Sequence, residues 1–121
     1  MIKKCIGLVM MAVALTAGAQ NISLVEETGN WYHVYDASGK KIKTLSSSIG
    51  ELQGFSSSFF IVKSGSWYHI YDALGKKTKT LSVSSVGDIV ATSGETFTSR
   101  HGAWIYTWSK EGKKLSTRSA R

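Results

Sequence analysis

The sequence predicts an all-β protein, an antiparallel meander of about three four-stranded repeats that each resemble one blade of a β-propeller. A phrase that runs from Gly29 to Ser46 returns almost unchanged from Gly65 to Ser82, and a more divergent copy begins at Gly102. The phrase is rich in aromatic and β-branched residues, which favour strands. Units of four short strands that recur every ~40 residues are typical of propeller blades. A β-trefoil or a small barrel is the alternative arrangement.

The N-terminal segment MIKKCIGLVMMAVALTAGAQ has the three parts of a secretory signal peptide. Lys3 and Lys4 supply positive charge, an apolar run follows, and Ala17-Gly18-Ala19 provides small residues for cleavage. The apolar run is too short for a transmembrane helix, which needs ~20 residues. We therefore expect residues 1–19 to be removed and residues 20–121 to form one exported domain, periplasmic or extracellular in a bacterium.

Cysteine content and charge narrow the chemistry of the mature chain. The only cysteine, Cys5, lies in the segment that we expect to be removed, which leaves no thiol for a disulfide, a nucleophile or a metal ligand. The formal net charge of +7 falls to +5 without Lys3 and Lys4. This modest positive excess favours anionic polymers or surfaces as partners.

The repeat extends beyond the doubled phrase in both directions. The segment SLVEETG, which ends at Gly29, corresponds to FFIVKSG and TFTSRHG, and IGELQGF corresponds to VGDIVAT. The units lie near residues 23–46, 49–82 and 86–118, and their first tryptophans recur at intervals of 36 and 37 residues. Since propellers have about four to eight blades, three units cannot close a ring unless the chain associates with copies of itself.

Strand and turn residues set the order of elements within a unit. WYHVYD, which starts at Trp31, is predicted to be a strand because of its aromatic content. The pattern from Asp36 to Gly39 suits a type I turn closed by a left-handed glycine, and the lysine-rich segment after it is the return strand. Ser109 replaces the aspartate in the third unit, and serine can cap the same backbone N–H groups.

The histidines of the repeated phrase do not indicate catalysis. His33 and Asp36 lie three residues apart, so on a strand they project from opposite faces. Tyr106 occupies the position of His33 and His69 in the third unit, and tyrosine can replace a packed ring but not a metal ligand or a general base. No known catalytic or metal-binding motif occurs elsewhere. We expect no enzyme activity, no cofactor and no metal.

The aromatic residues of the phrase allow two interpretations. Trp31, His33 and Tyr35 share one face of their strand, and Tyr32 and Val34 share the other. Both faces are largely apolar, which favours a position in the core. In the second interpretation, the rings form an exposed platform that stacks on sugars.

Lysines gather after each predicted turn, and they also allow two interpretations. Lysines on edge strands prevent aggregation between sheets, which is a protective role. In the functional interpretation, equivalent strands align their lysines into a cationic stripe for an anionic glycan or lipid headgroup, with nucleic acid not expected among the partners. The candidate ligand-binding residues are Trp31, Tyr32, Trp67, Tyr68, Trp104, Lys41, Lys77 and Lys114.

The stretches GNWYHVYDASGKKIKT and GSWYHIYDALGKKTKT resemble the aromatic hairpins of choline- and glucan-binding cell-wall repeats, which follow W-Y-Y-x-D-x-x-G-K-x-x-T. They are also similar to WG-type β-repeats of bacterial proteins. The resemblance covers one hairpin per unit, and the cell-wall repeats recur at a shorter period. It implies a surface for envelope polymers that includes Trp31, Tyr32, Trp67, Tyr68 and Trp104. The export junction and the layout of the chain resemble small secreted β-repeat proteins of Bacteroidetes-type bacteria.

We therefore expect an exported, non-enzymatic β-repeat module. Its ligand would be an envelope or extracellular polymer, either a glycan or an anionic surface, or a protein partner. The competing expectation is a structural subunit, a homo-oligomer whose repeats complete a shared sheet or propeller ring with copies of itself. Neither expectation needs a transmembrane segment after the signal peptide.

Overall fold

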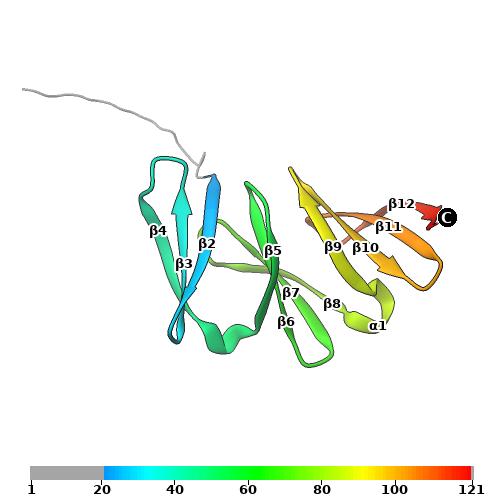
Figure 1. Cartoon of the computed structure of the whole chain (residues 1–121), viewed down its shortest axis with the longest axis horizontal. Coiled ribbons are helices and arrows are strands. Elements are labelled where there is room, and N and C mark those ends of the chain that lie inside the picture. The colour runs from blue at the N-terminus through cyan, green and yellow to red at the C-terminus, as the bar shows by residue number, and fades with distance from the viewer. Residues whose placement is uncertain (1–20, 121) are drawn as a thin grey trace, which may run out of the picture.

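The computed structural model describes residues 21–120, which form three antiparallel sheets that stand side by side (Figure 1). The predicted signal peptide, residues 1–19 with Cys5, lies outside the described residues. The strands of the three sheets, taken in order, are β2 (Ile22–Thr28), β3 (Trp31–Asp36) and β4 (Lys41–Ser46); β5 (Glu51–Phe55), β6 (Phe59–Ser64), β7 (Trp67–Asp72) and β8 (Lys77–Ser82); and β9 (Asp88–Ser93), β10 (Thr96–His101), β11 (Trp104–Ser109) and β12 (Lys114–Ser119).

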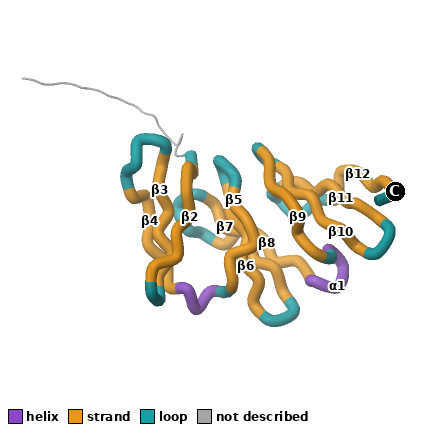
Figure 2. Tube along the Cα trace, in the orientation of Figure 1, coloured by secondary structure: helices purple, strands orange, loops and turns teal. Residues whose placement is uncertain are grey.

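Each sheet is a simple meander, because its strands are ordered as they are in the sequence. Two one-turn helices link the sheets: η1 (Ser47–Ile49) leads from β4 to β5, and α1 (Val83–Val86) leads from β8 to β9 (Figure 2). The prediction of an all-β meander with blade-like units is confirmed by these sheets of three, four and four strands. The described strands close no barrel, whereas a β-trefoil or a small barrel would need one.

The Asp-x-x-Gly turns form as their residues predict. The Oδ1 atom of Asp36 accepts backbone hydrogen bonds from Ser38 at 2.9 Å and from Lys40 at 3.0 Å, and Gly39 has a φ of 86°. A further hydrogen bond from the Ser38 hydroxyl, together with the bond from the Lys40 N–H, lowers the pKa of Asp36 below its ordinary value. In the third unit, Ser109 accepts the bond from Lys113 at 3.2 Å.

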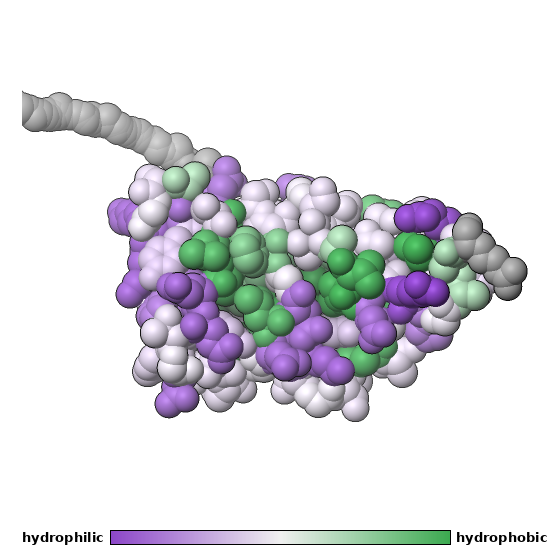
Figure 3. Space-filling model, viewed as in Figure 1, coloured by the Kyte–Doolittle hydropathy of each residue, from purple (hydrophilic) through white to green (hydrophobic). Residues whose placement is uncertain are grey.

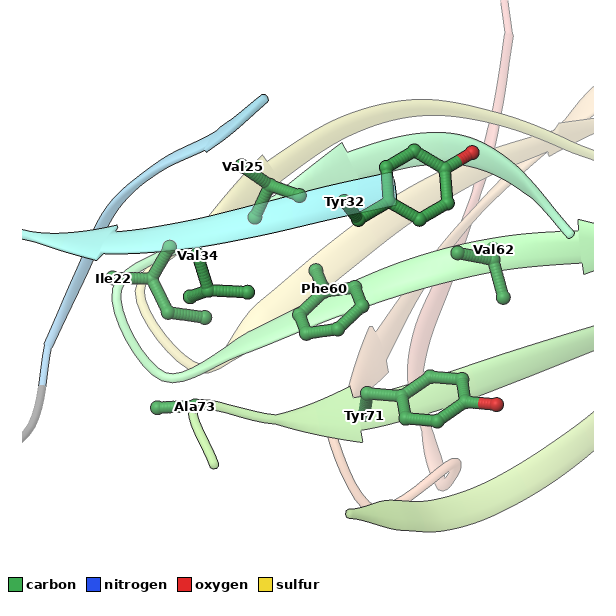
Figure 4. Close-up of a cluster of buried hydrophobic side chains, with 8 residues drawn as sticks. All are labelled: Ile22, Val25, Tyr32, Val34, Phe60, Val62, Tyr71 and Ala73. Carbon is green, nitrogen blue, oxygen red and sulfur yellow. The ribbon is translucent and has the colours of Figure 1, made fainter. Parts of the chain in front are cut away.

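Two hydrophobic cores hold the sheets together, one formed by the first and second sheets and one by the second and third. Strand β6 contributes to both, because its side chains alternate between its two faces. Phe60 and Val62 lie in the first core (Figure 4), whereas Phe59 and Ile61 lie in the second. All four are at most 1% exposed, so the middle sheet is buried on both faces along this strand. Burial of each such side chain stabilises the fold by ~1.5–3 kcal/mol.

The second and third sheets each carry a stacked aromatic pair on the face that packs against the sheet before it in the sequence. Phe60 stacks on Tyr71 with ring centroids 5.3 Å apart, and Phe97 stacks on Trp108 at 6.1 Å. The cross-strand register places Leu24 and Tyr35 at the equivalent position in the first sheet. Leu24 is 42% exposed, in agreement with the lack of a described sheet over this face.

Tyr32 and Tyr68 connect each sheet to the segment that leads into the next one. The Tyr32 hydroxyl donates to the Gly50 carbonyl at 2.7 Å and accepts from the Leu52 N–H at 3.1 Å. The Tyr68 hydroxyl donates to the Gly87 carbonyl at 2.6 Å. Burial raises the pKa of both phenols above the ordinary value, so both remain neutral donors over the physiological range. We call these contacts the tyrosine latches.

The outer face of the third sheet is more polar than the matching face of the second. Thr98 and Thr107 occupy the positions that Ile61 and Ile70 fill in the second sheet, and these isoleucines are 0% exposed. Ile105 replaces the latch tyrosine. Terminal units of repeat proteins carry such polar outer faces because no neighbouring unit covers them.

Candidate ligand-binding surface

The three repeated tryptophans lie at equivalent places on the molecular surface. Trp31, Trp67 and Trp104 are 52%, 51% and 50% exposed, whereas Trp108 is only 7% exposed. Each of the three is the first residue of its strand and follows a tight turn, and these turns lie along the lower side of the molecule in Figure 1. The sequence favours a core position for this whole row, and for these three residues that interpretation is wrong. A residue at the end of a strand extends beyond the neighbouring sheet and is left in solvent.

The predicted role of Tyr32 and Tyr68 in ligand binding also needs correction. Both are only 2% exposed, and both hydroxyls are used by the latches. Their rings project from the strand face opposite to that of the tryptophans and pack into the two cores. They therefore belong to the structure of the sheets and present no ring to a ligand.

The outer edge strands of the sheets, β4, β8 and β12, carry the predicted lysines. Lys41, Lys77 and Lys114 begin these strands and are exposed. Each lies across from an aromatic residue of the adjacent strand, and in the third sheet the Lys114 ammonium lies 3.9 Å from the centre of the Tyr106 ring. The lysines of these strands, and the one lysine that directly precedes the first of them in each sheet, form what we call the lysine edge: Lys40, Lys41, Lys43, Lys76, Lys77, Lys79, Lys113 and Lys114.

The lysine edge is continuous from sheet to sheet. A Cβ atom built on Gly75, in the β7–β8 turn, would lie 3.0 Å from Cγ of Lys43, and one built on Gly112, in the β11–β12 turn, would lie 2.7 Å from Cγ of Lys79. The lysine stem of one sheet thus packs on the turn of the next sheet. Glycine has no side chain and leaves room for this contact. The contact brings the lysines of successive sheets next to one another on one continuous surface.

Four of the eight acidic residues lie at the opposite edge of the sheets. Glu26 and Glu27 are on β2, Glu51 begins β5 and Asp88 begins β9. Three acidic residues lie at the turns of the lysine edge: Asp36, Asp72 and Glu111. The carboxylates of Asp36 and Asp72 accept hydrogen bonds from turn amides. The molecule therefore has a basic outer edge and a more acidic inner edge.

His33 and His69 of the repeated phrase lie on half-exposed strand faces, and each has a hydroxyl partner. Nδ1 of His33 is 3.2 Å from the Thr44 hydroxyl, and Nδ1 of His69 is 3.0 Å from the Thr80 hydroxyl. Burial, followed by the positive charge of Lys77, lowers the pKa of His69 below its ordinary value. These contacts agree with an aromatic spacer whose polar edge is satisfied.

One depression in the surface could not be foreseen from the sequence. It has a volume of about 290 Å³ and is lined by Ser58, Phe59, Asp72, Thr78, Lys110 and Glu111. The Ser58 hydroxyl oxygen is buried there without a hydrogen-bond partner among the described residues, and Lys110 forms an ion pair with Glu95 at 3.5 Å. These residues come from the second and third units, so their proximity depends on how the two units pack and could not be predicted from the sequence.

The described chain offers neither a metal site nor a membrane-spanning helix. Within residues 21–120, no group of three or more His, Cys, Asp or Glu side chains is arranged to hold a metal ion. The same residues contain no helix with the length and apolar character to cross a membrane.

Comparison with known proteins supports the fold. No protein-family model matches the sequence, and no curated protein matches it significantly. The chain is similar to a solved structure described as KlHsv2 with loop 6CD replaced by a Gly-Ser linker, with 15% sequence identity and a TM-score of 0.56. The match covers 95% of this chain and 39% of that chain, so the three sheets correspond to about two-fifths of the larger protein.

Proposed function

We propose that the chain is an exported, non-enzymatic β-repeat module that binds an anionic polymer along the lysine edge. The observation that carries this proposal is the repetition of exposed lysines at equivalent positions of three sheets in mutual contact. A ligand that itself repeats can meet several of them at once. A small anion would meet only one sheet.

The distribution of opposite charge supports an anionic ligand at this edge. Lys43 and Lys79 are fixed through their stems, while their ammonium groups extend into solvent. Protection against aggregation alone would be met by one or two charges on each edge strand. The edge strands carry one or two lysines each, and Lys40, Lys76 and Lys113 in the turns before them add charge beyond that need. The joint field of the eight lysines attracts an extended polyanion.

The tryptophans favour a glycan over other polyanions. Trp31, Trp67 and Trp104 recur with the same spacing as the lysines and keep about half of their surface in solvent. Tryptophan presents a large apolar ring with a polar N–H group, which suits the faces of sugar rings. An acidic polysaccharide of the envelope combines both chemistries.

The competing proposal, completion of a ring by copies of the chain, has weaker support. Stacking a further sheet on the third one would place Thr98 and Thr107 where isoleucines fill the core between the second and third sheets. The facing side of the first sheet offers Leu24 and Glu26 in place of Phe60 and Val62. Such a contact would bury much less apolar surface than the existing cores.

Affinity for polygalacturonate as a function of salt tests the proposal. We compare Lys41→Gln/Lys77→Gln with a matched control, Lys63→Gln/Arg100→Gln, which removes the same charge from β6 and β10. Each lysine contact adds somewhat less than one unit to the slope of log K against log salt. We expect the edge variant to reduce this slope by about 1.5 to 2, and the control to leave it nearly unchanged.

A second substitution distinguishes a glycan from a general polyanion. Trp67→Ala should weaken binding to polygalacturonate about two- to tenfold while leaving binding to polyglutamate unchanged, since one stacked ring contributes ~0.5–1.5 kcal/mol. Thermal unfolding of each variant checks that the fold is retained. Equal losses in the edge variant and its control, or no binding of either polymer at low salt, would contradict the proposal.

A further inference from the structure

The first sheet has one strand fewer than the other two among the described residues. In the second sheet β5 pairs with the inner edge of β6, and in the third sheet β9 pairs with the inner edge of β10. Strand β2 is the equivalent of β6 and β10, because all three enter the same type of tight turn before a tryptophan. Its inner edge has no strand partner among residues 21–120.

The open groups of this edge can be identified from the register. Thr28 and Trp31 flank a two-residue turn and pair with each other across it. The pair that closes such a turn is hydrogen-bonded, and hydrogen-bonded pairs alternate along an antiparallel ladder, so the backbone groups of Thr28 and Glu26 bond to β3. The backbone N–H and C=O groups of Val25 and Glu27 therefore point away from β3. At the N-terminal end of the edge, only the Ile22 N–H has a described partner, the Ser57 carbonyl at 2.6 Å.

The second sheet shows what fills an edge of this kind. Lys63, the equivalent of Glu27, pairs with Glu51 on β5, and Ile61, the equivalent of Val25, pairs with Gly54. A Cβ atom built on Gly54 would lie 3.1 Å from a Thr92 methyl group of the next inner strand. A strand at this position is thus short and antiparallel, and it carries a small residue where it passes its neighbour.

At one position of the strand before the tryptophan turn, the first sheet carries an acidic residue where the other two sheets carry a basic one. An acidic residue of the inner strand opposes a basic residue in both complete sheets, with Glu51 opposite Lys63 and Asp88 opposite Arg100. In the first sheet the outer member of this pair is Glu27, which is acidic. Opposite charges across a strand pair are stabilising and like charges are destabilising.

Further acidic groups lie close to this edge, on both faces of β2. Glu26 is exposed beside Glu27 on β2. The Coulomb effects of Glu27 and Glu51 both contribute to the raised pKa of Tyr32, with burial as the largest cause, so both carboxylates lie near this corner. A strand added at β2 would meet negative charge from two neighbouring elements.

We propose that the inner edge of β2 binds an extended segment of another protein chain as an added antiparallel strand. The segment carries Lys or Arg opposite Glu27 and Glu26 and a small residue opposite Val25. Binding of this kind takes its affinity from main-chain hydrogen bonds and its specificity from side chains on the two faces. It does not rest on the proposed function, because β2 and the lysine-bearing β4 are opposite edges of the first sheet.

Figure 3 shows the side of the molecule where this strand would lie. Apolar side chains gather there over β2, β5 and β9. Of the apolar residues on β2 and β9, Leu24 is 42% exposed and Val90 is 58% exposed. The edge of β2 therefore adjoins apolar surface that an added strand can cover.

Two synthetic peptides whose sequences derive from β5 test the proposal with the full chain. KKQGFS carries the basic pair, and EEQGFS is its control with the charge reversed. We expect KKQGFS to bind at least about tenfold more tightly, because two favourable pairs replace two repulsive ones. Nuclear magnetic resonance should show that the Val25 and Glu27 amides become protected from hydrogen exchange when it binds.

Two variants keep the test independent of stability. Glu26→Lys/Glu27→Lys should reverse the preference, so that EEQGFS binds more tightly. Glu27→Pro removes the open N–H group, which edge strands tolerate, and should abolish binding of both peptides. A thermal midpoint near that of the parent chain confirms that each variant folds.

Several outcomes would overturn the proposal. Equal binding of the two peptides, or no protection of Val25 and Glu27, would show that this edge does not select a basic strand. Protection of these amides without peptide would show that the edge is already occupied within the chain. Self-association that Glu27→Pro abolishes would assign the edge to a second copy.

Discussion

The tyrosine latches make a measurable contribution to stability that follows from their geometry. Tyr68→Phe removes one buried hydroxyl and leaves the Gly87 carbonyl, its acceptor at 2.6 Å, without that partner. Tyr32→Phe removes two bonds, to Gly50 and Leu52. A buried polar group that loses its partner costs ~1–3 kcal/mol, so we expect each variant to lower the free energy of unfolding by about 1–2 kcal/mol. The effects should add, because the latches share no partner.

Thermal unfolding followed by circular dichroism measures this contribution. A loss of about 1 kcal/mol lowers the midpoint of a domain of this size by ~4–8 °C, so the double variant, which loses about 2–4 kcal/mol, should unfold about 10–30 °C below the parent chain. Tyr35→Phe is the control, because Tyr35 lies on the outer face of the first sheet and takes no part in a latch.

The pH dependence provides a second readout. Burial raises the pKa of Tyr32 and Tyr68 above the ordinary value of a tyrosine phenol, which is about 10. A raised pKa in the folded state gives stability that is complete below the unfolded pKa and is lost as pH rises through the folded pKa. The parent chain should therefore lose stability above about pH 10 more steeply than the double variant. The reasoning is refuted if both single variants unfold at the midpoint of Tyr35→Phe and all share one alkaline profile.

Two further predictions concern the turns and connections. Gly87→Ala would drive a Cβ atom into the Arg100 carbonyl at a φ of 88°, so we expect the free energy of unfolding, measured by chemical denaturation, to fall by about 3 kcal/mol. Gly65→Ala, at a φ of 59° with open space around it, should lower this free energy by only about 1 kcal/mol. Equal losses would contradict the packing argument. Asp36→Ala should lower the thermal midpoint near pH 6. The difference should begin to shrink as pH falls below 3.8, because the turn hydrogen bonds lower the pKa of Asp36 and their stabilisation is lost as pH falls through that lowered pKa. A difference that grows as pH falls would show that the carboxylate does not act through them.

The repeats and their hairpins could be predicted because their signals are local. Asp36 and Gly39 identify one turn within four residues, and the same chemistry recurs in every unit. Ser109 in the third unit even indicates which property of the aspartate matters, since serine can accept the bond but cannot act as an acid. The two one-turn helices between sheets could not be predicted, because segments of three and four residues carry no period.

The environment of the aromatic residues could not be predicted in the same way. A strand that is apolar on both faces gives no alternation to show which side is covered. Tyr32 is buried and Trp31 is half exposed although they are neighbours, and the difference depends on how far the adjacent sheet extends. The third unit does contain a usable signal: Thr98 and Thr107 replace isoleucines on one face only, which indicates where the stack of sheets becomes polar.

The contacts between sheets also bear on how such a chain can change its length. The Lys43 stem packs on the Gly75 turn, and the Lys79 stem packs on the Gly112 turn. Both contacts between neighbouring sheets therefore join a lysine stem of one sheet to a turn glycine of the next. The middle unit carries both residues: Gly75 contacts the lysine of the preceding sheet, and Lys79 contacts the glycine turn of the next sheet. A gene duplication of this unit alone would therefore insert a fourth sheet that fits its neighbours on both sides. The chain can grow from its centre while its two ends, with their own surface chemistry, remain unchanged.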